Sequence, residues 1–345
     1  MNPTVTVLMP TYNAEAFLVE ALQSILSQTW KDFEFLIVND ASSDATPQIL
    51  AQTQDPRIRI IQNPTRLGVT GSLNRGLSEA RGQIVCRMDA DDISDPERIH
   101  LQTEHLLKEP KAGLVSSLYE FIDEKDLKVR TFKRPSLDPV LIHWNLLFRN
   151  YLGGHGQVAF KIDLARKVGG YSSELPYSQD YDLWLRLARV TEVHILTESL
   201  FKRRIHKDAI GTQKRAEQLQ CSIETAKTAL REVTGREISE KEILLLRKFM
   251  SSFFEAKKEF PSFEELSQLE RNLREIKSGF FESPFGRPFS SAHNRLKVKN
   301  EVSLQYWRLA RRSQRAGHFK MACLCAKQGL NWAPLSLLGT FSKTN

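Results

Sequence analysis

Apolar runs and segments with helical spacing alternate along the first part of the chain. A short apolar run bounded by turn residues predicts a buried strand, and apolar residues recurring every three or four positions predict a helix. This alternation predicts an α/β fold with a mostly parallel sheet covered by helices on both faces. The predicted strands are Val5–Met9, Phe33–Val38, Ile58–Ile61 and Ile84–Met88, and the predicted helices run to about Gln28, Leu50 and Ala80.

Polar residues follow three of these strands directly. They are Pro10–Asn13, Asp40 and Asp89–Asp92. Because ligands of such sheets bind beyond the carboxyl ends of the strands, we expect the three groups to converge on one edge. The alternative for each group is ordinary turn chemistry and helix capping, and Asn13 in particular is expected to cap the helix that follows it. Residues 67–71 are expected to form a loop before the third helix.

The sequence Met88-Asp89-Ala90-Asp91-Asp92 places three carboxylates in four positions after a buried strand. Carboxylates this close repel each other, and a folded protein tends to keep them near a cation. Oxygen ligands suit hard divalent ions such as Mg²⁺ or Mn²⁺. The alternative is an acidic turn that caps a helix starting near Pro96, and for an isolated Asp-x-Asp pattern that alternative is the commoner outcome.

The rest of the chain is less regular and then becomes helical. From about Thr212 the sequence is charged and helical in pattern, which predicts two domains, 1–211 and 212–345. In the middle, the expected elements are a strand at 113–118, a hairpin at 119–132, a flexible loop at 153–156, a strand at 157–160, a turn at 169–171, a helix at 179–189 and a last strand at 193–196. In the second domain, breaks are expected near Pro261 and from Ser283 to Pro288, and a helix pair at 306–332 turning at Gly317.

Composition restricts the partners and the compartment. The formal net charge of +8 over 345 residues suits anionic partners such as nucleotide-sugars, phospholipid surfaces or nucleic acid, or simply keeps the protein soluble. No nucleic-acid-binding module is recognisable, so we expect no nucleic-acid partner. The four cysteines lack paired metal spacing, which favours reduced thiols and a cytoplasmic location. Neither a signal peptide nor an apolar stretch of about 20 residues is evident.

An ordered set of motifs over about residues 3–211 resembles the family 2 inverting glycosyltransferases. The set comprises Val7–Asn13, Ser24–Thr29, Ile37–Thr46, Asn63, Gly68, Leu73-Asn74, Arg87–Asp92 with Pro96 and Arg98, Gly169–Tyr171, and Gln179–Arg186. The resemblance implies the GT-A fold and transfer of a sugar from a nucleotide-diphosphate donor to an acceptor hydroxyl. Three positions depart from the family pattern. Ala41 and Ala45 stand where the family commonly has glycine, which is tolerated unless the turn needs a positive φ, and Gln179 replaces a usual glutamate.

The resemblance assigns roles residue by residue. Asp180 is the implied general base, and Asp91 with His206 the implied ligands of Mn²⁺ or Mg²⁺. Asp89 is expected to contact the ribose or sugar, and Pro10, Thr11, Tyr12, Asn13, Asp40 and Arg66 to frame the nucleotide. Structural alternatives stand beside these roles: Asp180 as an acid favoured by the helix dipole, His206 as an ordinary structural histidine, and Arg66 as an exposed arginine. His155 is equally well a substrate contact or a plain loop residue, and Trp184 is expected in the core.

The expected activity is therefore a metal-dependent inverting transfer, most often from a UDP-sugar in this family. The acceptor would be a glycan or a lipid-linked hydroxyl in cell-surface polysaccharide synthesis. Gln179 and the two alanines motivate the alternative of a nucleotide-sugar-binding member with weak or no turnover. Peripheral contact with the inner face of the membrane is a further hypothesis, resting on Trp307 and four nearby arginines at 308, 311, 312 and 315. A solvated helix face is the favoured alternative.

Overall fold

The computed structural model describes residues 2–132, 137–207, 209–251 and 260–333. These residues divide into two compact units. One lies within Met1–Pro139 and Leu152–Ser222, and the other within Val140–Tyr151 and Ile223–Asn345. The first unit holds the β-sheet and the second is helical.

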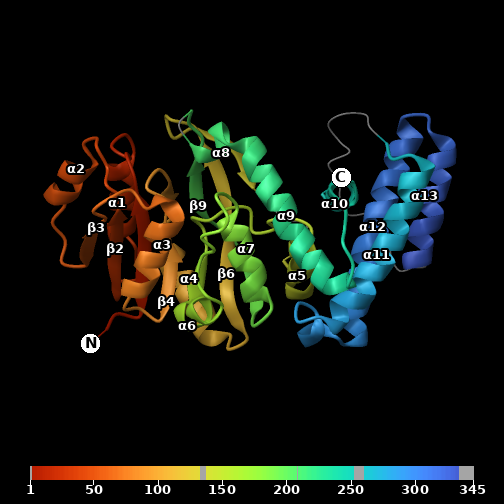
Figure 1. Cartoon of the computed structure of the whole chain (residues 1–345), viewed down its shortest axis with the longest axis horizontal. Helices are drawn as coiled ribbons and strands as arrows, with labels where there is room; N and C mark the ends of the chain where they lie inside the picture. The colour runs from red at the N-terminus through yellow and green to blue at the C-terminus, as the bar shows by residue number, and fades with distance from the viewer. Residues whose placement is uncertain (1, 133–136, 208, 252–259, 334–345) are drawn as a thin grey trace. The chain divides into compact units, whose positions relative to one another are not determined.

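The first half of the sheet is parallel, as the alternation predicts. Its strands β1 (Val5–Thr11), β2 (Phe33–Asn39), β3 (Ile58–Gln62) and β4 (Ile84–Arg87) lie in the order β3-β2-β1-β4. Figure 1 shows β3, β2 and β1 side by side with α1 (Leu18–Leu26), α2 (Thr46–Gln52) and α3 (Gly68–Glu79) around them. Thr11 pairs with Asn39, so the ends of β1 and β2 lie next to each other. The polar residues after these strands therefore meet at one edge.

Antiparallel pairings extend the sheet beyond β4. Strand β8 (Ala159–Lys161) runs antiparallel to both β4 and β6 (Ala112–Ile122), and β9 (Glu192–Arg204) runs parallel to β6. Strand β5 (Ile93–Ser94) pairs antiparallel with β9. The expected hairpin is present, because β6 returns as β7 (Lys128–Phe132) through a turn at Asp123–Leu127. The short helices of this part are α4 (Arg98–Lys108), α6 (Ile162–Lys167), α7 (Gln179–Ala188) and α8 (Ile210–Gln213).

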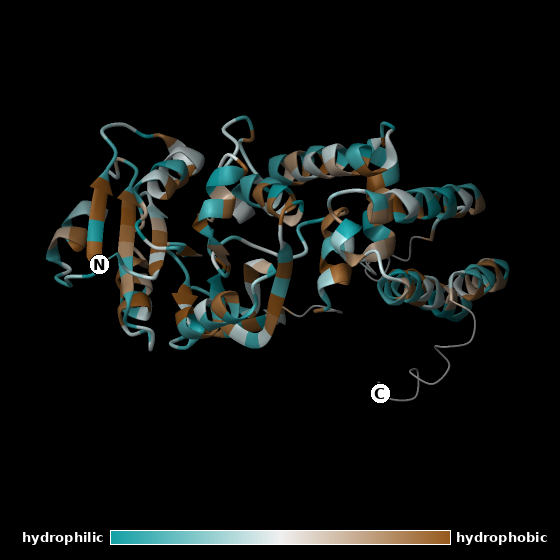
Figure 2. Ribbon diagram, turned by 90° about the horizontal axis from the view of Figure 1, so that it is seen from below, coloured by the Kyte–Doolittle hydropathy of each residue, from teal (hydrophilic) through white to brown (hydrophobic). Residues whose placement is uncertain are grey.

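The core of the first unit lies on both faces of the parallel strands. All seven residues of β2 are buried, as are six of the seven in β1. Figure 2 colours these strands mainly as hydrophobic, whereas the surrounding helices alternate hydrophobic and hydrophilic residues. Burying a Val, Leu, Ile or Phe side chain stabilises the fold by about 1.5–3 kcal/mol. Burial on both faces explains why these runs read as continuous apolar strands.

Two local predictions are wrong and a third gives too short a strand, because distant groups act in place of local ones. Asn13 does not cap a helix: α1 begins at Leu18, and Asn13 has φ +47° with its side-chain oxygen accepting from Ser43 N at 2.9 Å. Residues 68–71 are not a loop, because α3 begins at Gly68. Strand β9 continues to Arg204, so the basic residues 202–204 lie inside a strand and pair with residues 120–122 of β6.

The second unit contains α5 (Pro139–Leu146), which the sequence did not predict, and five long helices. These are α9 (Arg215–Thr234), which begins in the first unit, α10 (Glu240–Met250), α11 (Phe263–Glu282), α12 (Ala292–Arg315) and α13 (Phe319–Trp332), with a short 3₁₀ turn η2 (Arg287–Phe289). Capping boxes at Ser239 and Ser262 begin α10 and α11. The predicted helix pair is confirmed as α12 and α13, with Gly317 at φ +80° between them. Among the described residues, no helix combines the length and apolarity that crossing a membrane requires.

Candidate active site

The acidic turn after β4 divides its three carboxylates between different partners. Asp92 is 3% exposed, and its Oδ1 accepts from Arg204 N at 2.8 Å. Burial raises the pKa of Asp92 well above its ordinary value, and the charges of Asp91 and Asp89 raise it further. Asp92 therefore ties the acidic turn to β9.

Asp91 meets His206, which lies 115 residues later in the sequence. His206 Nε2 is 2.9 Å from Asp91 Oδ2, and the Asp91 side chain is 34% exposed. Burial alone would raise the pKa of Asp91, but the hydrogen bond and the charge of His206 outweigh it and hold that pKa below its ordinary value. The turn thus presents one ionised, accessible carboxylate beside one imidazole.

This pair fits a divalent cation whose other ligands come from a bound molecule. A carboxylate oxygen and an imidazole nitrogen suit Mn²⁺, and Mg²⁺ commonly takes one or two carboxylates together with substrate phosphates. Within the described ranges, no group of three His, Cys, Asp or Glu side chains is placed to hold a metal ion. Asp91 and His206 would therefore hold an ion only together with phosphate oxygens and water.

Asp89 faces a different cation. Its Oδ1 lies 2.5 Å from Nη1 of Arg87, whose side chain is almost fully buried. The loop at 153–156 lies against Asp89, because a Cβ added to Gly156 would come within 2.9 Å of Asp89 Oδ2. Arg98 fixes that loop by donating to Gly156 O at 2.6 Å and to Arg87 O at 2.8 Å. Burial lowers the pKa of Arg98 to about 10, so it is still charged at neutral pH.

The ends of β1 and β2 carry the residues expected to frame a nucleotide. Pro10 pairs with Val38 within the parallel ladder, and Thr11 is buried with its Oγ1 lacking a hydrogen-bond partner among the described residues. Tyr12 is 39% exposed, and the Arg66 guanidinium lies over its ring at 4.0 Å. The edge thus carries a buried hydroxyl and an exposed aromatic ring stacked by a guanidinium.

Asp40 closes the same edge from the end of β2. Its Oδ1 accepts from Asn63 Nδ2 at 2.7 Å and from Leu67 N at 2.8 Å, and its Oδ2 accepts from Gly68 N at 2.8 Å. Asp40 thereby caps α3 from another strand, which is why residues 68–71 are helical. A carboxylate can accept about four hydrogen bonds, so Asp40 keeps capacity for about one donor from a ligand.

Helix α7 carries Asp180 in its first turn. The preceding Ser178 has φ +60°, a left-handed conformation that is uncommon for a residue with a side chain. Asp180 is half-buried, and its Oδ1 accepts from Tyr181 N at 2.8 Å. Asp182, two residues later, forms an ion pair with Arg186 at 2.6 Å. Trp184 is fully buried, as expected of a core residue.

A half-buried His155 and a buried Tyr171 form a pair beside α7. His155 Nε2 is 2.7 Å from the Tyr171 hydroxyl, and the imidazole meets the Trp184 ring edge-on at 5.8 Å. Burial holds the pKa of His155 well below 6.5, and the charges of Arg87 and Arg203 lower it further, so the imidazole is neutral at pH 7. His155 is thus a constrained residue between the acidic turn and α7.

Sequence analysis assigned no site role to four of the residues that organise this site: Arg87, Tyr171, Arg203 and Arg204. Their charges or hydrogen bonds act on the acidic turn, on His155 or on Asp180. The charge of Asp180 helps to raise the pKa values of both Tyr171 and Arg203. Signals were nevertheless present, because Arg87 and Tyr171 lie inside the family motifs and Arg203 and Arg204 stand just before His206.

Comparisons with known proteins identify the family of this chain. The sequence profile described as Glycosyl transferase family 2 matches residues 6–162. An uncharacterized glycosyltransferase from Methanocaldococcus jannaschii is 35% identical over 209 residues, which cover 59% of this chain and 71% of that protein. The chain belongs to the family 2 glycosyltransferases. Another uncharacterized glycosyltransferase, from Haemophilus influenzae, is 31% identical over 244 residues, covering 67% of this chain and 73% of its own length.

The solved structures confirm the GT-A fold of this glycosyltransferase. Residues 1–349 of TarS from S. aureus, in complex with UDP-GlcNAc, superpose with a TM-score of 0.58 at 16% identity. The match covers 94% of this chain and 91% of the TarS chain. It therefore includes the helical C-terminal region as well as the sheet.

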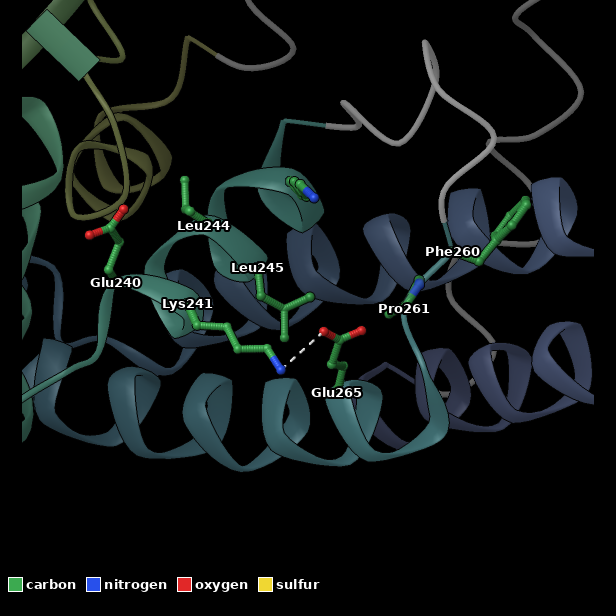
Figure 3. A pocket seen from close by; sticks show the side chains of 8 residues that line it. Glu240, Lys241, Leu244, Leu245, Phe260, Pro261 and Glu265 are labelled. Atoms are coloured by element: carbon green, nitrogen blue, oxygen red, sulfur yellow. Dashed lines mark ion pairs between the residues drawn. The ribbon is translucent and has the colours of Figure 1, made fainter. Parts of the chain in front are cut away.

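A pocket of about 590 Å³ lies in the second unit, between α10 and α11. Figure 3 shows the Lys241–Glu265 ion pair, at 3.6 Å, beside the apolar side chains of Leu244 and Leu245. None of the residues lining this pocket belongs to the site described above.

Proposed function

We propose that this glycosyltransferase moves a sugar from a UDP-sugar to a hydroxyl of a glycan or lipid-linked acceptor, with inversion at the anomeric carbon. The observation that carries the proposal is the Asp91–His206 pair at 2.9 Å, at the strand-end edge of the sheet that also carries Asp40 and the Tyr12–Arg66 stack. The TarS complex with UDP-GlcNAc supports a uridine donor on this fold. We further propose that residues 1–211 form the transferase domain.

The nucleotide end of the site has three elements that could recognise a base and ribose. The Thr11 hydroxyl is buried without a partner and gains one if a ribose or base comes within reach. The aromatic face of Tyr12 offers stacking, and Arg66 over that ring adds positive charge near the phosphates. Asp40 accepts one further hydrogen bond, which suits an imide N–H or a ribose hydroxyl.

Asp91 and His206 would hold Mn²⁺ or Mg²⁺, which supplies charge neutralisation of the departing diphosphate when bound. Asp89 keeps one oxygen on Arg87 and presents the other toward the loop at 153–156, where it would accept from ribose or sugar hydroxyls. Asp180 would take the proton of the attacking acceptor hydroxyl. Its place in the first turn of α7 keeps it half-exposed to an incoming acceptor.

With a glycan or lipid-linked acceptor, we propose that the enzyme acts in the cytoplasm and contributes to cell-surface polysaccharide synthesis. We also considered peripheral contact of α12 with the inner membrane face, for which Trp307 was the apolar candidate. The Trp307 indole packs against Gly329 of α13, with Nε1 3.0 Å from the position that a Cβ on Gly329 would take. Trp307 therefore gives this membrane contact no support. A competing proposal is that the protein binds a nucleotide-sugar but turns it over weakly. Gln179 favours it, since the residue before Asp180 carries no charge.

Calorimetric titration with UDP, GDP and dTDP, with and without Mn²⁺, tests the donor site. We expect UDP to bind more tightly with Mn²⁺, and Asp91→Ala to remove that metal dependence. Asp180→Asn should keep UDP binding but lower the transfer rate by about 10²- to 10⁴-fold. Asp182→Asn is the matched control on the same helix turn and should retain activity. If no nucleotide binds with or without Mn²⁺, the proposed donor site is refuted. If UDP binds but no sugar is transferred in a screen of acceptors, the weak-turnover alternative is favoured.

A further inference from the structure

Arg204, the last residue of β9, places a guanidinium in the interior directly behind the acidic turn. Its side chain is 1% exposed. A cation at that depth is costly unless its donors are matched by acceptors. Each nitrogen is matched: Nε donates to Asp91 O at 3.0 Å, Nη2 to Glu20 Oε2 at 2.6 Å, and Nη1 to Asp126 Oδ1 at 2.5 Å and Asp123 O at 3.3 Å.

The same residue also supports His206 through an aromatic ring. The guanidinium lies over the ring of Phe17 at 4.5 Å, and that ring packs against the His206 imidazole with centroids 5.1 Å apart. The backbone N–H of Arg204 holds Asp92. One residue therefore contacts the main chain of Asp91, the side chain of Asp92 and the ring that backs His206.

The contacts of Arg204 join three segments that are distant in the sequence. Glu20 lies on α1, Asp123 and Asp126 in the β6–β7 turn, and Asp91 in the acidic turn. An apolar side chain of similar volume could fill this space without the cost of burying a charge. The fork geometry of arginine, by contrast, fixes several oxygens at set distances from one another. We therefore expect Arg204 to fix the relative positions of these oxygens rather than simply to fill space in the core.

We propose that Arg204 is a positioning residue that sets the placement of the Asp91 carboxylate against the His206 imidazole, and thereby the affinity of the site for a divalent cation. This inference rests on the proposed function. Groups that orient metal ligands typically change metal affinity by about 10- to 100-fold when they are removed. The contacts of Arg204 described above are all with protein groups and its side chain is 1% exposed, so its effect should fall on the metal and leave the nucleotide contacts in place.

Arg57 provides a matched control in the same unit. It also pairs with a carboxylate, Asp55, at 2.8 Å, donates to the Leu26 carbonyl at 3.0 Å, and lies over the Phe33 ring at 4.6 Å. Arg57 stands just before the amino end of β3, on the sheet edge opposite the site. Its side chain is 23% exposed, against 1% for Arg204, so its substitution removes contacts of the same kinds from a less buried position, without touching the acidic turn.

The experiment measures Mn²⁺ binding by electron paramagnetic resonance at saturating UDP, in the wild type and in Arg204→Lys, Arg204→Met, Arg57→Lys and Arg57→Met. We expect Mn²⁺ affinity to fall by about 10- to 100-fold in the Arg204 variants and to change by less than about twofold in the Arg57 variants. UDP affinity without metal should stay within about twofold in all five proteins. The Mn²⁺ concentration for half-maximal transfer should rise in the Arg204 variants, and the rate at saturating Mn²⁺ should largely recover.

A double variant covers the case in which the Arg204 variants do not fold. Glu20→Gln with Asp126→Asn keeps Arg204 but weakens two of its anchors, both about half-exposed. It should weaken Mn²⁺ binding by about 3- to 10-fold. Unchanged Mn²⁺ affinity in folded Arg204→Met, or in the double variant, would show that Arg204 serves stability alone and overturn the inference. Failure of the wild type itself to bind Mn²⁺ with UDP would overturn the proposed metal site, and the inference with it.

Discussion

Ala41 occupies a backbone conformation that favours glycine, in the turn that follows Asp40. Its φ is +56°, in the left-handed region. The family commonly has glycine at this position, and alanine is free of strain there only if φ is negative. The positive φ of Ala41 therefore shows that the turn carries strain. The neighbouring network keeps the conformation in place, because Asn39 Oδ1 accepts from Ser42 Oγ at 2.6 Å and Ser42 Oγ accepts from Asn13 N at 3.0 Å.

Ala41→Gly should therefore stabilise the protein. The left-handed conformation costs a residue with a Cβ about 1–2 kcal/mol, and glycine loses about 0.5–1 kcal/mol of unfolded-state entropy on folding. The difference predicts a net gain of about 0.5–1 kcal/mol. For a unit of this size that is a rise in melting temperature of about 1–4 °C.

Ala45→Gly is the matched control, because Ala45 stands in the same turn with φ −73°. Glycine relieves no strain at a negative φ, and at the N-cap of α2 glycine is tolerated at least as well as alanine, so this variant should change stability by less than about 0.5 kcal/mol. Chemical denaturation of the two variants and the wild type, with melting temperatures alongside, measures both effects. If Ala41→Gly is no more stable than the wild type, or no more stable than Ala45→Gly, the strain assigned to Ala41 is refuted.

Two further predictions concern the site. Burial depresses the pKa of His155, so below pH 6.5 the unfolded chain binds a proton at this residue that the folded chain does not. The unfolding free energy should therefore be independent of this residue above pH 6.5. Below pH 6.5 it should decrease as the pH falls, by up to about 1.4 kcal/mol per pH unit. Denaturation between pH 5 and pH 6.5 gives the slope of the unfolding free energy against pH, and in His155→Gln this slope should be smaller by the contribution of about one proton. Equal slopes in the two proteins would count against a neutral imidazole in the folded chain. Tyr12→Ala should weaken UDP binding by about tenfold through loss of stacking, while Tyr12→Phe should stay within about twofold; equal calorimetric affinities for all three proteins would remove Tyr12 from the nucleotide site.

The elements that the sequence predicted well are those whose pattern is local. Strands β1, β2 and β4 are buried on both faces, so their apolar runs stand out, and the half-buried β3 keeps a short apolar run between turn residues. The breaks near Pro261 and after Ser283 follow from residues that interrupt helices. The predicted start of the third helix failed for a non-local reason. Leu67 N and Gly68 N are satisfied by Asp40, a residue on another strand, and nothing within 67–71 indicates that partner.

The candidate site shows the same division between local and distant causes. Strand ends at Thr11, Asp40 and Asp91 could be placed on one edge from the alternation alone. The contact between Asp91 and His206 came from the resemblance, since no spacing rule joins residues 115 positions apart. The ion pair of Asp182 with Arg186 follows from their i, i+4 spacing once α7 begins at Gln179.

The basic residues before His206 show what a wrong strand length conceals. With the last strand expected at 193–196, the basic residues 202–204 fall outside any predicted element, and no side of the sheet can be assigned to them. Once β9 extends to Arg204, successive side chains must point to opposite faces of the sheet. Arg203 then lies near the loop at 153–156, with Nη1 at 3.4 Å from Gly153 O, while Arg204 turns toward Glu20 and Asp91. The two adjacent arginines therefore lie in two different parts of the site. Because side chains alternate between the two faces of β9, it is Arg204 rather than Arg203 that lies behind the acidic turn.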